Sequence, residues 1–209
     1  MVLLKMALFV KGYDSKLPVK RSNDVLLITA DGKTLLDDLR LFLGWEVPHD
    51  VMCVGRSIRA YPGKVDHWAE VDADASNWVA ANLEKHYPDK VRNGQIYKHT
   101  LGKHKGFDFD WDVEGADFPM AEAMWHGSTA LFAVMIALEM TYRPIVLAGV
   151  PLDSKGHWYF DDETYGPHWT AETYQAWFEF NTSENAKHVK SMSGYTQQIL
   201  GKASKKWLL

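Results

Sequence analysis

The sequence predicts a single α/β domain built on a mainly parallel sheet, and three observations support this prediction. Continuous apolar runs at 24–30 and 144–150 are typical of strands that are covered on both faces. Apolar residues recur at helical spacing through 35–43, directly after the first run. A helix rich in small residues, 129–142, comes directly before the second run, as in a βαβ crossover. The 209 residues suit one hydrophobic core, so we expect residues 1–209 to form one domain with helices on both sheet faces.

The other elements are expected from shorter signals. In chain order they are strands at 50–54 and 67–71, a helix through 78–83, a possible strand at 95–100, a helix at 170–180, a strand at 188–192 and a helix at 195–200. The segment 107–112 alternates aromatic and acidic residues, which fits either an edge strand with one wet face or a surface loop. The irregular stretch 151–167 is long enough for an active-site loop or lid.

Composition argues against several classes of protein. The net charge of −4 and the pI of about 6.1 predict no nucleic-acid partner and no anionic membrane partner. The single cysteine, Cys53, lies in an apolar run, so we expect a buried thiol and a reducing compartment. No run approaches the roughly 20 apolar residues that span a bilayer. The N-terminal run is interrupted by Lys5 and lacks a small-residue cleavage site, so a cytoplasmic location without a membrane span is expected.

Glycine and polar residues follow the expected strands, where ligands of open parallel sheets bind. The candidate nucleotide-binding residues are Asp31, Gly32, Lys33, Gly55, Arg56, Ser57, Asp72, Gly127, Ser128, Gly149, Pro151, Asp153, Ser193 and Gly194. Gly127 and Ser128 open a helix, whose free N–H groups favour anions. Lys33 or Arg56 is expected to offset phosphate charge. Neither the dinucleotide fingerprint nor the P-loop motif is present.

The expected lid carries His157, Tyr159, Tyr165 and His168. A loop histidine near a ligand can act as an acid or a base because its pKa lies near neutrality, although most surface histidines are inert. The histidine and cysteine spacings match no zinc site, and 107–112 does not match a calcium loop, so no metal is predicted.

Part of the chain resembles a known group of enzymes. Gly127-Ser128, an alanine-rich helix, Ile145 to Leu152, Tyr159-Phe160-Asp161, Gly166-Pro167-His168 and Ser193-Gly194 follow one another in order. The stretch from Gly127 to Leu200 resembles the C-terminal half of bacterial CMP-sialic-acid-dependent sialyltransferases. It also resembles the Rossmann-like hydroxymethylpterin diphosphokinase-like and motility-accessory-factor proteins. The first half fits more loosely, through Trp68 to Asp72 and Trp78, and resembles phage-encoded members.

The resemblance implies a Rossmann-like fold and a transferase whose substrate is a nucleotide-activated donor, with no separate cofactor. In the sialyltransferases a lid histidine is the general base toward the acceptor hydroxyl, and His168 stands at the matching position. Pro151 occupies the place of a family acidic residue, with Asp153 two residues later. Asp31-Gly32-Lys33-Thr34-Leu35 replaces the family turn Asn-Gly-Pro-Ser-Leu. Two functions therefore remain open: a glycosyltransferase-like enzyme, or a non-catalytic nucleotide-binding or interaction protein that has retained the fold.

Overall fold

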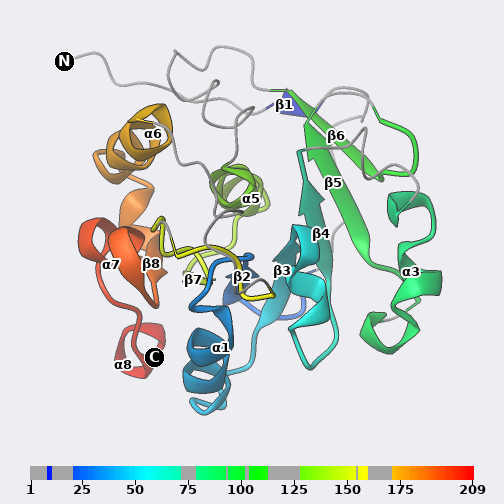
Figure 1. The fold of residues 1–209 in the computed structure, drawn as a ribbon, viewed down its shortest axis with the longest axis horizontal. Coiled ribbons are helices and arrows are strands. Elements are labelled where there is room, and N and C mark those ends of the chain that lie inside the picture. Colours follow the sequence, from blue (N-terminus) through cyan, green and yellow to red (C-terminus); the bar gives the residue numbers. More distant parts are fainter. Residues whose placement is uncertain are drawn as a thin grey trace.

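The architecture is a Rossmann-like α/β fold around one eight-stranded sheet (Figure 1). The structure, a computed structural model, describes residues 9–10, 21–71, 79–92, 94–101, 104–112, 128–153, 155–159 and 171–209. The strand order is β1-β6-β5-β4-β3-β2-β7-β8, in which the last seven are mutually parallel and β1 is antiparallel to β6. The strands are β1 (Phe9–Val10), β2 (Leu26–Thr29), β3 (Asp50–Val54), β4 (His67–Glu70), β5 (Tyr97–Leu101), β6 (Phe109–Asp112), β7 (Ile145–Ala148) and β8 (Val189–Ser191).

Strand β2 marks the point where the strand order reverses. Its register pairs Leu26 with Asp50 of β3 on one side and with Ile145 of β7 on the other. The predicted strands at 24–30, 50–54 and 144–150 are therefore confirmed as parallel neighbours in one sheet. Ligand crevices of doubly wound sheets lie beyond the strand ends at such a reversal.

Helices cover both faces of the sheet, as predicted. One face packs against α1 (Leu35–Leu43), η1 (Gly55–Arg59) and α3 (Leu83–His86), and the other against α5 (Thr129–Glu139), α6 (Ala171–Asn181) and α7 (Gly194–Leu200). The short elements η2 (Pro88–Lys90), η4 (Ala186–His188) and α8 (Lys205–Leu208) complete the described part. Helix α5 is buried from Ala130 to Leu138, and its small residues let it lie close across β2, β3 and β4.

Two elements differ from the sequence-based expectations. The segment 107–112 contains a strand, β6, but that strand is not at the edge of the sheet, because β1 pairs with it on its far side. The buried rings of Phe109 and Trp111 explain its aromatic alternation. Helix α8 was not expected, and it begins where Ser204 accepts a hydrogen bond from the backbone N–H of Trp207. The helix expected through 78–83 lies partly outside the described residues.

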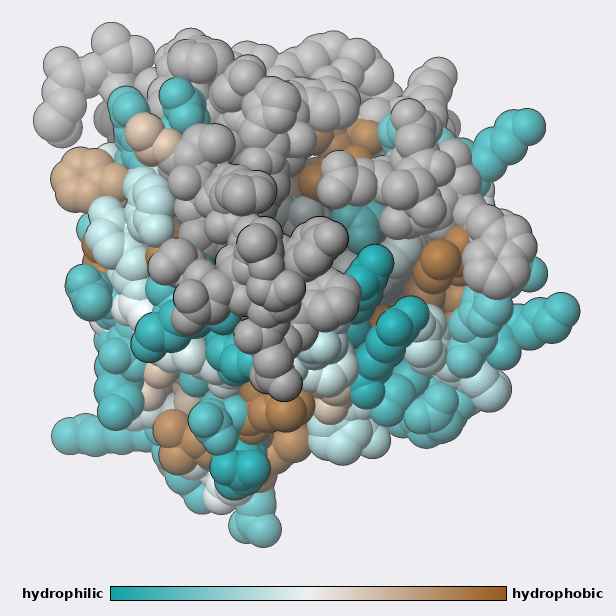
Figure 2. Space-filling view, in the orientation of Figure 1, coloured by the Kyte–Doolittle hydropathy of each residue, from teal (hydrophilic) through white to brown (hydrophobic). Residues whose placement is uncertain are grey.

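On the face shown in Figure 2, hydrophilic residues predominate and the hydrophobic patches between them are small and separate. Among the residues that the structure describes, the large apolar side chains that are exposed are Leu36, Leu41, Phe178 and Leu209. None of the helices in the described part of the chain combines the length and apolar character that a bilayer crossing needs. Cys53 is fully buried on β3, and burial raises the pKa of its thiol to about 12, so it is an inert core residue.

A directional chain of buried hydrogen bonds crosses the core beneath β3 to β6. The indole of Trp111 donates to Nδ1 of His99 (3.1 Å), so His99 must carry its proton on Nε2. That nitrogen then donates to Nδ1 of His67 (3.1 Å), and Nε2 of His67 donates to the Tyr142 hydroxyl (3.2 Å). Tyr142 finally donates to a carboxylate oxygen of Asp50 (2.9 Å).

The two histidines of this hydrogen-bonded network, His67 and His99, are held neutral by burial. Burial lowers the pKa of His67 to about 4 and that of His99 well below its usual value. The chain satisfies every ring nitrogen in a dry environment, where an unpaired polar group would be costly. The network therefore fixes the positions of strands β3 to β6 and of the segment after helix α5 relative to one another.

Candidate functional site

The predicted nucleotide-binding residues that the structure describes follow the carboxyl ends of strands, with one exception. Asp31, Gly32 and Lys33 follow β2; Gly55, Arg56 and Ser57 follow β3; Gly149, Pro151 and Asp153 follow β7; Ser193 and Gly194 follow β8. The exception is Ser128, the N-cap of α5. Asp72, Gly127, Tyr165 and His168 lie outside the described residues. The edge divides into two halves with different chemistry, a closed half at β2, β7 and β8 and an open half at β2, β3 and β4.

In the closed half the glycines make room for backbone. Gly149 has a positive φ of 69°, and a Cβ there would overlap the carbonyl oxygen of Ala30. Side chains on Gly32 or Gly194 would overlap Pro151, and the N–H of Gly32 donates to the carbonyl of Gly149 (2.9 Å). The crevice at the strand-order reversal is therefore filled by the chain itself. We assign Gly32, Gly149, Pro151 and Gly194 to this packing rather than to direct phosphate contact.

A buried carboxylate, Asp38, organises the closed half and was missed in the sequence. It accepts hydrogen bonds from the N–H of Gly149 (2.9 Å) and from the hydroxyls of Ser193 (2.7 Å) and Thr34 (3.0 Å). Burial raises the pKa of Asp38, and these three donors oppose the rise. The available signal was an acid on the apolar face of a helix, at the spacing of Leu35, Leu39 and Phe42.

Two predicted hydroxyls are committed to the fold. Ser57 is fully buried and bonds both the Thr29 hydroxyl (2.8 Å) and the backbone of Val54. Ser128 is 1% exposed and accepts the indole N–H of Trp177 (2.9 Å). We therefore assign the side chains of Ser57 and Ser128 to core structure, and the expected nucleotide contact of these two residues stays a prediction.

Asp31 is the centre of the open half. Its Oδ2 accepts the backbone N–H of Arg56 (3.0 Å), and its Oδ1 accepts the indole N–H of Trp158 (3.2 Å). Gly55, with a φ of 56°, lies beside it: a Cβ there would stand 3.0 Å from Oδ2 of Asp31 and 3.7 Å from Oε2 of Glu70. Two carboxylates, from the ends of β2 and β4, thus flank one glycine.

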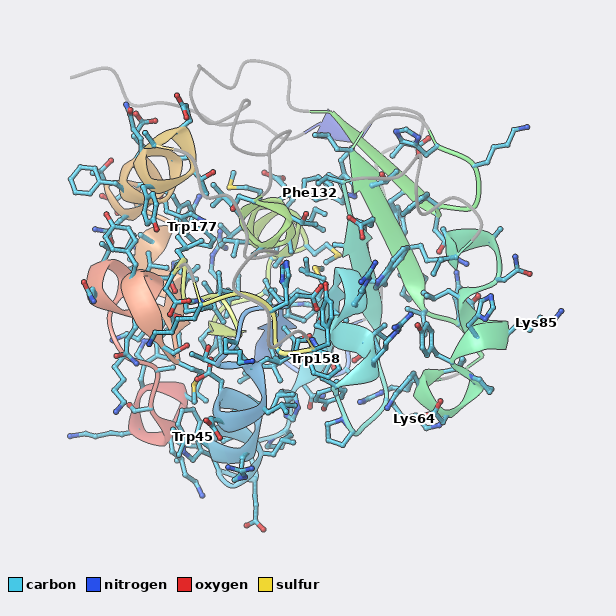
Figure 3. All side chains as sticks on the ribbon, in the orientation of Figure 1. Trp45, Lys64, Lys85, Phe132, Trp158 and Trp177 are labelled. Carbon is cyan, nitrogen blue, oxygen red and sulfur yellow. The ribbon has the colours of Figure 1, made fainter. Side chains whose placement is uncertain are left out.

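Residues 155–159 of the expected lid rest on the end of β2. The N–H of Lys33 donates to Gly156 (3.1 Å), and the N–H of Trp158 donates to the carbonyl of Asp31 (3.0 Å). Because a carbonyl can only accept, the contact of His157 Nδ1 with that same oxygen (3.3 Å) places the ring proton on Nδ1. Trp158, labelled in Figure 3, contributes both its backbone and its indole to the contact with Asp31.

Aromatic and cationic groups surround the Asp31 carboxylate. The rings of His157 and Tyr159 are parallel, with centroids 5.2 Å apart, and the guanidinium of Arg56 lies 5.2 Å from the Tyr159 centroid. Arg59 donates from Nε to the Tyr87 hydroxyl (3.1 Å). Residues three apart in a 3₁₀ helix eclipse, so Arg56 and Arg59 emerge from the same side of η1.

The open half has perturbed electrostatics. Burial raises the pKa of Asp31 to about 6, and the donors Arg56 and Trp158 oppose that rise by stabilising the charged form. Burial also lowers the pKa of His157. A carboxyl with a raised pKa next to an imidazole with a lowered pKa is typical of functional sites. Among the described residues, no three His, Cys, Asp or Glu side chains are placed to hold a metal ion.

Comparison with models of protein families, with curated proteins and with solved structures gave no match.

Proposed function

We propose that the protein is a nucleotide-dependent transferase, glycosyltransferase-like, that binds a nucleotide-activated donor at the open half. The convergence of the half-buried Asp31 carboxylate with Arg56, His157 and Tyr159 at the ends of β2 and β3 carries this proposal. The resemblance of 127–200 to sialyltransferases supports the same reaction class. A cytoplasmic location is part of the proposal.

Each group of the open half suits a part of such a donor. Arg56 and Arg59 offer guanidinium groups for phosphate oxygens. The half-buried rings of His157 and Tyr159 offer flat apolar surface next to those charges. Sialyltransferase-like chemistry would use His168 as the base, and this role stays a prediction because His168 lies outside the described residues.

One observation favours the alternative, a non-catalytic nucleotide-binding or interaction protein. Pro151 fills the crevice at the strand-order reversal, where doubly wound sheets usually bind ligands. The first turn also departs from the sialyltransferase pattern. The two functions differ in turnover and not in binding, so both must be measured.

A thermal-shift screen with CMP, UDP, GDP, their sugar conjugates and ATP tests binding, because a ligand of the native state raises its melting temperature. Release of nucleotide from the sugar conjugates tests turnover. Arg56→Ala removes the guanidinium but keeps the N–H that bonds Asp31, and it should weaken nucleotide affinity about tenfold. Arg40→Ala, an exposed arginine of α1 paired with Asp37, is the matched control and should leave affinity unchanged.

Binding without turnover would favour the non-catalytic alternative. No binding of any probe, or equal losses in the two arginine variants, would contradict the assignment of the nucleotide to the open half.

A further inference from the structure

We propose that Asp31, in place of the His168 that the resemblance implies, takes the proton from the acceptor hydroxyl during transfer; this role rests on the proposed function. In that step the acceptor O–H bond breaks and its proton passes to the Asp31 carboxylate. The acceptor oxygen forms a bond to the transferred carbon of the donor. The bond from that carbon to the phosphate oxygen breaks, and its electron pair leaves on the phosphate beside Arg56 and Arg59.

The carboxylate is fixed for such a role by donors on both of its oxygens. The N–H of Arg56 bonds Oδ2 (3.0 Å), the indole N–H of Trp158 bonds Oδ1 (3.2 Å), and each carboxylate oxygen retains a second acceptor position. Gly55 has no side chain, and a Cβ at that position would stand 3.0 Å from Oδ2. The absence of that side chain leaves space next to Oδ2.

The protonation state of Asp31 suits a base that works near neutral pH. Burial raises its pKa to about 6, close to the value at which a general base is both deprotonated and basic enough to accept a proton. Charged and titratable groups face Asp31 from each neighbouring element; these are Arg56, Arg59, Glu70, His157, Tyr159 and the buried Cys53. The arginines oppose the effect of burial, which remains the larger influence.

A purely structural role is the competing interpretation, because Asp31 also ties η1 and segment 155–159 to the end of β2. The two interpretations differ in pH dependence. A base must be deprotonated, so turnover should rise with pH through the Asp31 pKa. A residue with only a structural role affects the stability and the amount of folded protein. It does not set the pH at which turnover rises.

Trp158→Phe separates the two roles. It keeps an aromatic ring but removes the N–H that stabilises charged Asp31. The Asp31 pKa should therefore rise above about 6, and the acidic limb of kcat/KM should move to higher pH. Asp31→Asn should lower turnover by roughly 10²-fold or more, while affinity for the unreactive nucleotide stays within about threefold.

The measurement is nucleotide release from CMP-, UDP- and GDP-activated sugars as a function of pH, alongside calorimetric titration with the free nucleotides. A limb near pH 6 that moves upward in Trp158→Phe supports the proposal, and it decides the matter even if Asp31→Asn does not fold. Turnover with a limb that stays in place, or undiminished turnover in folded Asp31→Asn, overturns the Asp31 role and leaves the transferase standing. No binding of any nucleotide by the unaltered protein overturns both.

Discussion

The two halves of the carboxyl edge of the sheet have similar sequence signals, but they differ in how deeply the acidic residue is buried and in what surrounds it. Each combines glycine turns with an acid, yet the closed half buries Asp38 under Gly149 and Ser193, whereas the open half leaves Asp31 half-buried among Arg56 and aromatic rings. In the closed half the missing side chain of a glycine makes room for backbone, whereas in the open half it leaves space beside a carboxylate oxygen. A glycine after a strand therefore indicates close approach of some group, and the structure is needed to say which.

The largest effect is expected from a side chain in the closed half. Gly149→Ala forces a positive φ on alanine and overlaps the carbonyl of Ala30, so it should lower the free energy of unfolding by about 3 kcal/mol or more. Gly94→Ala is the matched control, because Gly94 has a similar φ of 85° but nothing within 4 Å. It should cost about 1 kcal/mol. Denaturant unfolding gives both values, and equal losses would show that the closed half is not packed as described.

An intermediate effect on the free energy of unfolding is expected when the pH is lowered, because buried His67 must then take up a proton. The folded pKa of His67, about 4, lies below the ordinary value of 6.5, so the unfolded chain binds the proton more tightly. The contribution of His67 to the free energy of unfolding is complete above pH 6.5 and is lost as the pH falls toward 4, on the order of 3 kcal/mol. Denaturant unfolding across this range measures the slope. His67→Gln should flatten it, and an unchanged slope in that variant would remove His67 from the account.

The smallest effect on stability is expected at the open half, where function should suffer instead. Gly55→Ala strains a φ of 56° and brings a methyl 3.0 Å from Asp31 Oδ2, which should cost about 1–2 kcal/mol. Because that methyl covers the carboxylate, turnover should fall further than stability alone explains. Unfolding and nucleotide release measured on the same sample check this. A variant that loses stability while its folded fraction keeps full turnover would place the reacting groups elsewhere.

The sheet could be predicted because parallel strands that are buried on both faces consist of continuous apolar residues, and 24–30, 50–54 and 144–150 are such runs. Strand β6 was ambiguous because its own buried residues, Phe109 and Trp111, are aromatic and because its pairing with β1 is a long-range contact. Asp31, Arg56, His157 and Tyr159 were all selected from the sequence. The division of the carboxyl edge into a closed and an open half could not be predicted, because it depends on which loop Pro151 packs against. Asp38 was missed because an acid in a first helical turn usually faces solvent.

The most direct test of the central claim, that ligand binds the open half, is a backbone and indole NMR titration. The probe is whichever of CMP, UDP or GDP raises the melting temperature most. We expect the largest shifts at the amides of Gly55 and Arg56 and at the Trp158 indole, with Gly149 and Gly194 nearly unmoved. Largest shifts at Gly149 and Gly194, or no shift at the Trp158 indole at saturation, would contradict the account.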